Sequence, residues 1–145
     1  MKKQKINEAK IILSALSCNE SLARAYISAF ISQLDPTLDE LADVRCAVSE
    51  AVTNCVVHAY KGCDTPGKIY INARLYSDRS VTVEVSDRGC GIENIEMAMT
   101  PLFTTDSAGE RSGMGFSVMK SFTDSIKVTS KPSGGTRVFM SKKFS

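Results

Sequence analysis

The chain has 145 residues, of which 43% are hydrophobic and 23% charged, an ordinary composition for a globular protein. A formal net charge of +2, without a stripe of basic and aromatic residues, argues against nucleic acid as a partner. No apolar run approaches the roughly 18 residues of a membrane span, and the polar N-terminus is not typical of a secretory signal. We therefore expect one domain, residues 1–145, large enough to bury a core without covalent or metal cross-links. We also expect the basic residues near both ends to be solvated, namely Lys2, Lys3, Lys5, Lys142 and Lys143.

The five cysteines indicate reduced thiols. Their number is odd and no C-x-x-C pair occurs, so the sequence supports neither a disulfide framework nor a zinc site. Cys46 and Cys55 fall within an apolar helical pattern and are expected to be small core residues. Free thiols suit the cytoplasm, where we expect the protein to act.

The first half of the chain predicts a strand followed by two helices. Residues 6–16 are interpreted as the strand, and residues 19–34 carry apolar side chains at the i, i+3, i+4 spacing of an amphipathic helix. Thr37 and Glu40 have the spacing of a capping box, with Thr37 as the N-cap. The second helix that they open is expected to run to about Tyr60.

In the second half the hydrophobic period changes to two, which is typical of strands. A long segment at about 93–112 has only a weak pattern and is more typical of a functional lid than of a simple connection. The predicted elements are strands at 68–75 and 81–85, a helix from the glycines at 113–115 to 122, and strands at 125–130 and 136–141. Their order indicates an α+β fold, a two-layer α/β sandwich whose mixed, mainly antiparallel sheet has the helices on one face.

The sequence Asp87-x-Gly89-x-Gly91 directly follows the second of these strands. A carboxylate at a strand end, beside a backbone with few side chains, allows a flat ligand to approach closely. Taken by itself, the same pattern more often marks an ordinary strand-ending turn.

Glu50, Asn54 and His58 recur at i, i+4 and i+8 on the second helix. An Asn oxygen can hold a Mg²⁺ that is bound to phosphates, and a Glu one turn earlier can take a proton from an attacking hydroxyl or water. An exposed polar stripe is the commoner explanation of such spacing. His58 is expected to pack or hydrogen-bond at the edge of such a site rather than to act as a base.

Gly113-Met114-Gly115 stands at the start of a predicted helix, where free backbone N–H groups and the helix dipole favour a phosphate. Arg111 just before it could hold a terminal phosphate with its guanidinium group. A tight turn with a surface arginine is the simpler alternative. Gly134-Gly135-Thr136 has the composition of an ordinary hairpin turn.

Together these motifs resemble the N, G1 and G2 boxes and the final threonine of the GHKL ATPase/kinase superfamily, in the family's order. The motifs are Glu50-x-x-x-Asn54, Asp87-x-Gly89-x-Gly91, Gly113-x-Gly115 and Gly135-Thr136. The chain is more closely similar to the small bacterial anti-sigma-factor serine kinases. That similarity lies in residues 15–21, 34–41, 48–54, 101–105 and 110–116, and it covers nearly the whole chain.

The resemblance implies a Bergerat-type fold that binds Mg-ATP, and a homodimer that sequesters a sporulation sigma factor. It also implies a kinase that phosphorylates a serine of an anti-anti-sigma partner. By this resemblance Glu50 is the base, Asn54 the Mg²⁺ ligand and Asp87 the acceptor for the adenine amino group, while Gly89 and Gly91 allow close approach of the base.

The resemblance further implies that a set of residues around the lid surrounds the phosphates: Thr104, Thr105, Arg111, Gly113 and Gly115. Thr136 would support adenine binding, and Arg24 matches a family position on the partner-binding surface. Ala59 departs from the family pattern, in which a glycine is usual.

Two functions therefore remain open. One is an ATP-dependent serine kinase that is also an anti-sigma factor. The other is a nucleotide-gated sigma-binding module without kinase activity; the presence of Glu50 favours the kinase. We expect neither a sensor histidine kinase nor a gyrase- or chaperone-type ATPase, because the chain is too short for their further helices and domains.

Overall fold

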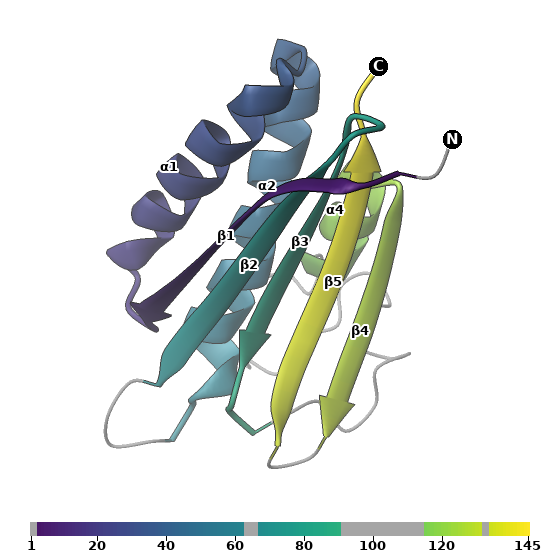
Figure 1. Cartoon of the computed structure of the whole chain (residues 1–145). Coiled ribbons are helices and arrows are strands. Elements are labelled where there is room, and N and C mark those ends of the chain that lie inside the picture. Colours follow the sequence, from purple (N-terminus) through teal and green to yellow (C-terminus); the bar gives the residue numbers. More distant parts are fainter. Residues whose placement is uncertain (1–2, 63–66, 91–114, 132–133) are drawn as a thin grey trace.

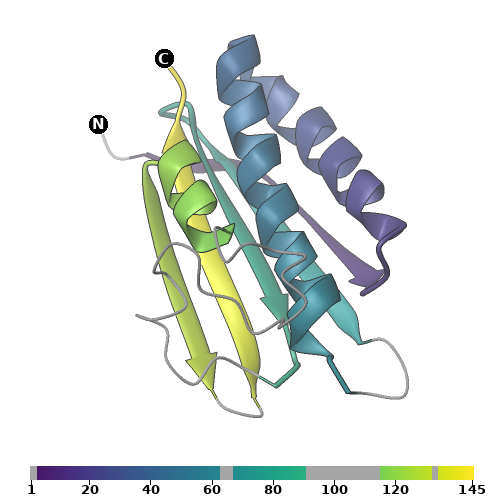
Figure 2. The ribbon, with the colours of Figure 1, turned by 180° about the vertical axis from the view of Figure 1, so that it is seen from behind.

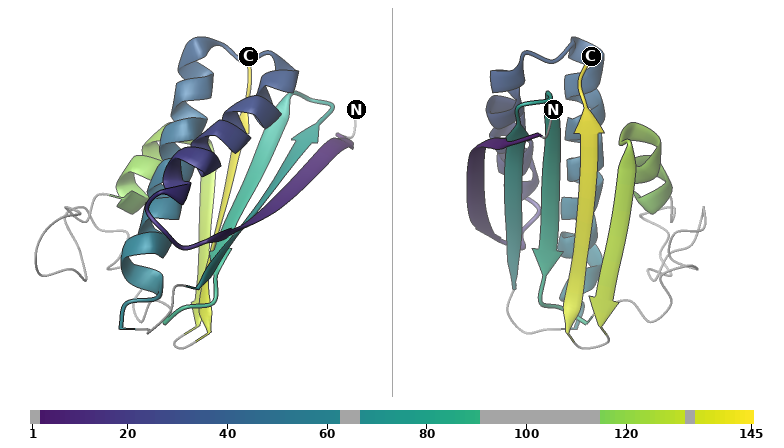
Figure 3. Two further views of the ribbon diagram at one scale, coloured as in Figure 1. Left: turned by 90° about the vertical axis from the view of Figure 1, so that its left-hand side faces the viewer. Right: turned by 45° about the vertical axis from the view of Figure 1, so that its right-hand side comes forward.

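The computed structural model describes residues 3–62, 67–90, 115–131 and 134–145, which form two layers. The helices lie together on one face of a sheet, as Figures 1 and 2 show from opposite sides and Figure 3 shows in profile. Within these ranges, none of the helices is both long and apolar enough to cross a membrane. The elements are β1 (Lys5–Ser14), α1 (Asn19–Ile31), a 3-10 helix (Ser32–Leu34), α2 (Leu38–Asn54), a π-helix (Cys55–Ala59), β2 (Lys68–Tyr76), β3 (Ser80–Asp87), α4 (Gly115–Phe122), β4 (Ser125–Lys131) and β5 (Gly135–Lys143). The predicted α+β sandwich is confirmed.

The sheet has five strands in the order β1-β2-β3-β5-β4, and every described pair of neighbours is antiparallel. It is therefore more regular than the mixed, mainly antiparallel sheet that we expected. Strands β2 and β3 form a hairpin in which Arg79 adopts a left-handed φ of 69°. The register places Asp87, the last residue of β3, opposite Ile69 near the start of β2.

The core lies between the sheet and the helices. Alternate residues of β2 and β3 point into it, because successive side chains of a strand face opposite sides of a sheet. Each fully buried aliphatic side chain of this kind contributes about 1.5–3 kcal/mol relative to an exposed one. The largest fully buried aliphatic side chains are Ile27, Ile31, Val48, Val52, Ile69, Ile71, Leu75, Val81 and Val85.

The outer face of the sheet carries polar side chains and ion pairs. Glu8 of β1 pairs with Lys5 at 2.8 Å and with Arg74 of β2 at 2.6 Å. Hydrogen bonds from these two cationic side chains, Lys5 first, lower the pKa of Glu8 to about 2. On the neighbouring strands Arg137 Nε lies 2.8 Å from a carboxylate oxygen of Glu84.

Helix α2 begins with the predicted capping box. The hydroxyl of Thr37 accepts the backbone N–H of Glu40 at 3.1 Å, and the carboxylate of Glu40 accepts the backbone N–H of Thr37 at 2.9 Å. These two bonds satisfy N–H groups that have no partner inside the helix.

The last turn before Tyr60 is π-helical rather than α-helical. The apolar pattern of this segment predicts a helix but does not distinguish i→i+4 from i→i+5 hydrogen bonding. His58 lies within this π-helical turn, after the α-helical part of the segment that carries Glu50 and Asn54.

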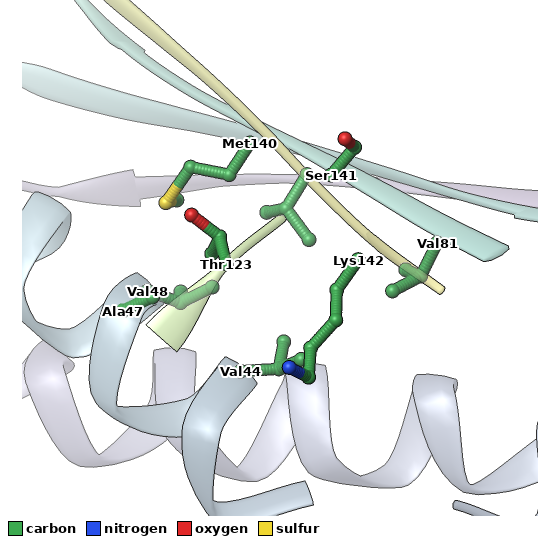
Figure 4. Close-up of a pocket in the computed structure, with 9 residues that line it drawn as sticks. Val44, Ala47, Val48, Val81, Thr123, Met140, Ser141 and Lys142 are labelled. Carbon is green, nitrogen blue, oxygen red and sulfur yellow. The ribbon is translucent and has the colours of Figure 1, made fainter. Parts of the chain in front are cut away.

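The expectation that both ends are solvated is wrong for Lys142. Its side chain is only 15% exposed, and its ammonium group lies 3.5 Å from Asp43. Figure 4 shows the side chain reaching from β5 toward Val44 of α2, where it lines a small pocket between the two layers. In this position the aliphatic stem of Lys142 is buried while its ammonium group stays paired with Asp43. Lys3, Lys5 and Lys143 are exposed as expected, and Lys2 lies outside the described residues.

Candidate functional site

The candidate site is built around Asp87, which is 8% exposed at the end of β3. Its Oδ1 accepts the backbone N–H of Gly89 at 2.9 Å and that of Thr136 at 3.2 Å. Its Oδ2 lies 3.5 Å from Sγ of Cys55 in the π-helix. These donors offset the cost of removing a carboxylate from water. Asp87 therefore joins β3, the start of β5 and the end of the second helix.

Cys55 is a buried thiol, 4% exposed, as the helical pattern predicted. Burial, and then the negative charge of Asp87, raise the pKa of this thiol well above its ordinary value. The group is consequently a protonated S–H at neutral pH, not a reactive thiolate. Cys46, also expected in the core, is only half-buried on α2; both residues, like Cys18 and Cys90, are in the thiol form.

Two glycines allow the backbone to approach closely around Asp87. A Cβ atom on Gly89 would overlap the carbonyl oxygen of Ala59, which accepts the N–H of Cys90 at 2.8 Å. Gly135 has a φ of +92°, and a Cβ there would overlap the carbonyl oxygen of Asp87. Both positions thus require glycine for packing of the protein itself. The predicted hairpin turn before Thr136 is confirmed at Gly135.

The second helix brings Glu50 and Asn54 to this region. Both are half-buried on α2, and Asn54, its last residue, directly precedes Cys55. The predicted Mg²⁺ ligand, Asn54, is therefore the chain neighbour of Cys55, which contacts Asp87. Glu50 stands one turn earlier on the same helix.

Arg24 of α1 is linked to the same helix. Its Nη1 donates to the hydroxyl of Ser49 at 3.3 Å, and Ser49 is the residue before Glu50. A second contact between the helices joins the hydroxyl of Thr53 to the carboxylate of Glu20. The predicted partner-binding residue therefore touches the helix that carries the predicted base.

The remaining predicted site residues are described only in part. Gly115 begins α4, which confirms the helix expected after the glycines. The lid at 93–112, the adenine-site candidate Gly91 and the other phosphate-binding candidates lie outside the described residues; those candidates are Thr104, Thr105, Arg111 and Gly113.

Three polar contacts of the site have no signal in the sequence. The hydroxyl of Tyr60 accepts the N–H of Arg88 at 2.8 Å and donates to the carbonyl of Lys68 at 2.6 Å, which ties the π-helix to two strands. The hydroxyl of Ser130 on β4 lies 3.0 Å from that of Thr136. Each depends on tertiary proximity, so local spacing could not reveal it.

The chain matches a family model described as the histidine kinase-like ATPase domain over residues 13–142. It is 50% identical over 138 residues to the anti-sigma F factor of Clostridium acetobutylicum, covering 95% of this chain and 94% of that protein. It is also 53% identical over 126 residues to the anti-sigma F factor of Caldanaerobacter subterraneus subsp. tengcongensis, covering 87% and 86% of the two proteins.

Solved structures of lower identity share the fold. The RsbU and RsbW domains of a Mycobacterium tuberculosis protein match with a TM-score of 0.70 at 21% identity, over 95% of this chain and 32% of that longer one. A blue-light activated histidine kinase of Erythrobacter litoralis matches with a TM-score of 0.61 at 18% identity, over 83% and 40% of the two chains. The family model and the relatives of 50% and 53% identity show that the chain belongs to the histidine kinase-like ATPase family and, within it, to the anti-sigma F factors.

Proposed function

We propose that the protein binds Mg-ATP, phosphorylates a serine of an anti-anti-sigma partner, and as a homodimer sequesters a sporulation sigma factor in the cytoplasm. The observation that carries this proposal is the buried, hydrogen-bonded carboxylate of Asp87 beside the helix of Glu50 and Asn54. The names of the relatives, anti-sigma F factors, support the sigma-binding part.

Asp87 fits the role of adenine acceptor. Its Oδ1 is already engaged by two backbone N–H groups, which leaves Oδ2 to accept the exocyclic amino group of the base. A carboxylate that is buried and held at a fixed angle discriminates between donor and acceptor groups on a ligand, because a mismatched partner leaves a buried charge unsatisfied. Thr136 would assist from β5, and Gly91 would keep the nearby backbone unobstructed.

Glu50 and Asn54 fit the phosphoryl end of the site. The amide oxygen of Asn54 is a suitable ligand for Mg²⁺, which would neutralise charge on the phosphates. Thr104, Thr105, Arg111, Gly113 and Gly115 would surround those phosphates.

In the transfer step, the serine Oγ forms a bond to the γ-phosphorus while the bond from phosphorus to the bridging oxygen of ADP breaks. The proton of the serine hydroxyl passes to the carboxylate of Glu50.

Arg24 fits a partner-binding role. It is half-exposed on α1, and its contact with Ser49 fixes the guanidinium group next to the helix that carries Glu50. A partner that engages Arg24 would thus lie close to the residues proposed for chemistry.

One experiment separates the kinase from the alternative, a nucleotide-gated sigma-binding module without kinase activity. The protein is mixed with Mg-ATP, an anti-anti-sigma protein and a sporulation sigma factor, and both phosphoserine and complex formation are measured. Glu50→Gln should abolish phosphoserine while it spares ATP binding, because the amide keeps the shape but accepts no proton. A stable sigma complex without any phosphoserine from the unmodified protein would establish the binding module instead.

A further inference from the structure

The two carboxylate oxygens of Asp87 lie in different surroundings. Oδ1 accepts two backbone N–H groups, from Gly89 and Thr136, and a carboxylate oxygen offers about two acceptor positions. Within the described part of the chain, Oδ2 faces a side-chain donor, the thiol of Cys55, at 3.5 Å. Oδ2 therefore retains one position for a ligand on the side away from that thiol.

We propose that Cys55 is a positioning residue for adenine recognition: its S–H donates to Oδ2 of Asp87 and directs the remaining lone pair of Oδ2 to the exocyclic amino group of the base. This inference rests on the proposed binding of ATP and adds to it a residue outside the family motifs quoted above.

The position of Cys55 suits this role. It is the first residue of the π-helix, 4% exposed, and packed within the main core, so its side chain has little freedom to turn away. The backbone N–H of Cys55 is bonded to the carbonyls of Ala51 and Val52, which fixes the Cα–Cβ direction. The raised pKa of the thiol keeps the proton on sulfur at neutral pH, and only the protonated form donates.

The orientation of Asp87 would otherwise depend on Oδ1 alone. Two donors on Oδ1 hold that oxygen in place, but the carboxylate group can still rotate about an axis through Oδ1, which moves Oδ2. A third donor on the other oxygen removes this motion, and preorganised acceptors bind a ligand donor more tightly. Because S–H is a weak donor, we expect its loss to weaken ATP binding by only about three- to tenfold.

The test compares ATP with purine riboside triphosphate, which lacks the exocyclic amino group, by equilibrium competition for a fluorescent nucleotide. Cys55→Ala should weaken ATP binding about three- to tenfold and leave binding of the analogue within about twofold. Cys55→Ser keeps a donor and should restore ATP affinity to within about twofold. Cys46→Ala, the same change at a half-buried position on α2, is the matched control and should alter neither nucleotide.

Thermal unfolding of each variant checks the fold, and Cys55→Val, which fills the volume without a donor, replaces Cys55→Ala should that variant not fold. Equal losses for ATP and the analogue would assign Cys55 to packing and overturn the inference, as would unchanged ATP affinity. If the unmodified protein bound neither nucleotide, the proposed function would fail first and this inference with it.

Discussion

Replacing Asp87 by Asn tests the nucleotide site directly, because the two side chains have the same shape. The amide oxygen of Asn can take the place of Oδ1 and accept the N–H groups of Gly89 and Thr136, at 2.9 and 3.2 Å in the native protein. The amide nitrogen then replaces Oδ2 beside Cys55 and faces the expected amino group of adenine. Two N–H donors would meet, so the variant should fold but lose ATP binding.

The size of the effect follows from two contributions. A hydrogen bond to a charged group is worth about 1.5–3 kcal/mol, and a buried donor left without an acceptor costs about 1–3 kcal/mol more. A combined loss of about 3–5 kcal/mol corresponds to an affinity lowered by about 100-fold to a few thousandfold. The measurement is isothermal titration with Mg-ATP, alongside circular dichroism to verify the fold.

Glu84→Gln provides the matched control. It makes the same acid-to-amide change on the same strand, on the outer face of the sheet, where Glu84 pairs with Arg137 at 2.8 Å. Surface pairs of this kind contribute about 0–1 kcal/mol to stability, and ATP affinity should not change. An Asp87→Asn protein that bound ATP as tightly as the native one would refute the assignment of Asp87 to the base.

Three further changes test the fold. Thr37→Ala removes the N-cap of α2 and should lower the free energy of unfolding by about 1 kcal/mol in chemical denaturation. Gly135→Ala, at a φ of +92°, should cost about 2 kcal/mol or more, and a thermal midpoint like that of the native protein would contradict the described turn. Glu8→Gln addresses pH. The folded pKa of Glu8 is about 2 against an ordinary value of 4.5, so its stabilisation is complete above 4.5 and lost as the pH falls toward 2. The native protein should therefore be more stable than the variant at pH 7, and this difference should shrink in denaturation measured near pH 2.5.

Much of the fold could be predicted from local patterns. Period-two runs located the strands, and the capping box located the start of α2 at the correct residue. The same patterns contain no information on which strands become neighbours, since β3 pairs with β5 rather than with β4. They also missed the π-helix, because one extra residue in a turn leaves the apolar spacing of a short segment nearly unchanged.

Glu50 and Asn54 are candidates that local sequence can suggest, because they are spaced four residues apart on one helix. The contact of Cys55 with Asp87 joins residues 32 positions apart, and nothing in either local sequence indicates it. The burial of Lys142 was missed for the same reason, since its partner Asp43 lies on α2, far away in the sequence. From the sequence alone, a lysine near a terminus is expected to lie in solvent. Only the packing of the sheet against the helices shows that the aliphatic stem of Lys142 lies against α2.

Gly89 shows that a motif glycine can also be required for packing of the protein itself. Gly89 was interpreted as an opening for the adenine base, yet the space that its missing side chain leaves is filled by the carbonyl of Ala59. Any larger residue at Gly89 must first displace the π-helix, so a loss of ATP binding in such a variant would report disrupted packing as readily as a blocked ligand. Substitutions that preserve shape, at Asp87 and Cys55, separate the two causes because they change hydrogen bonding and leave the backbone where it is.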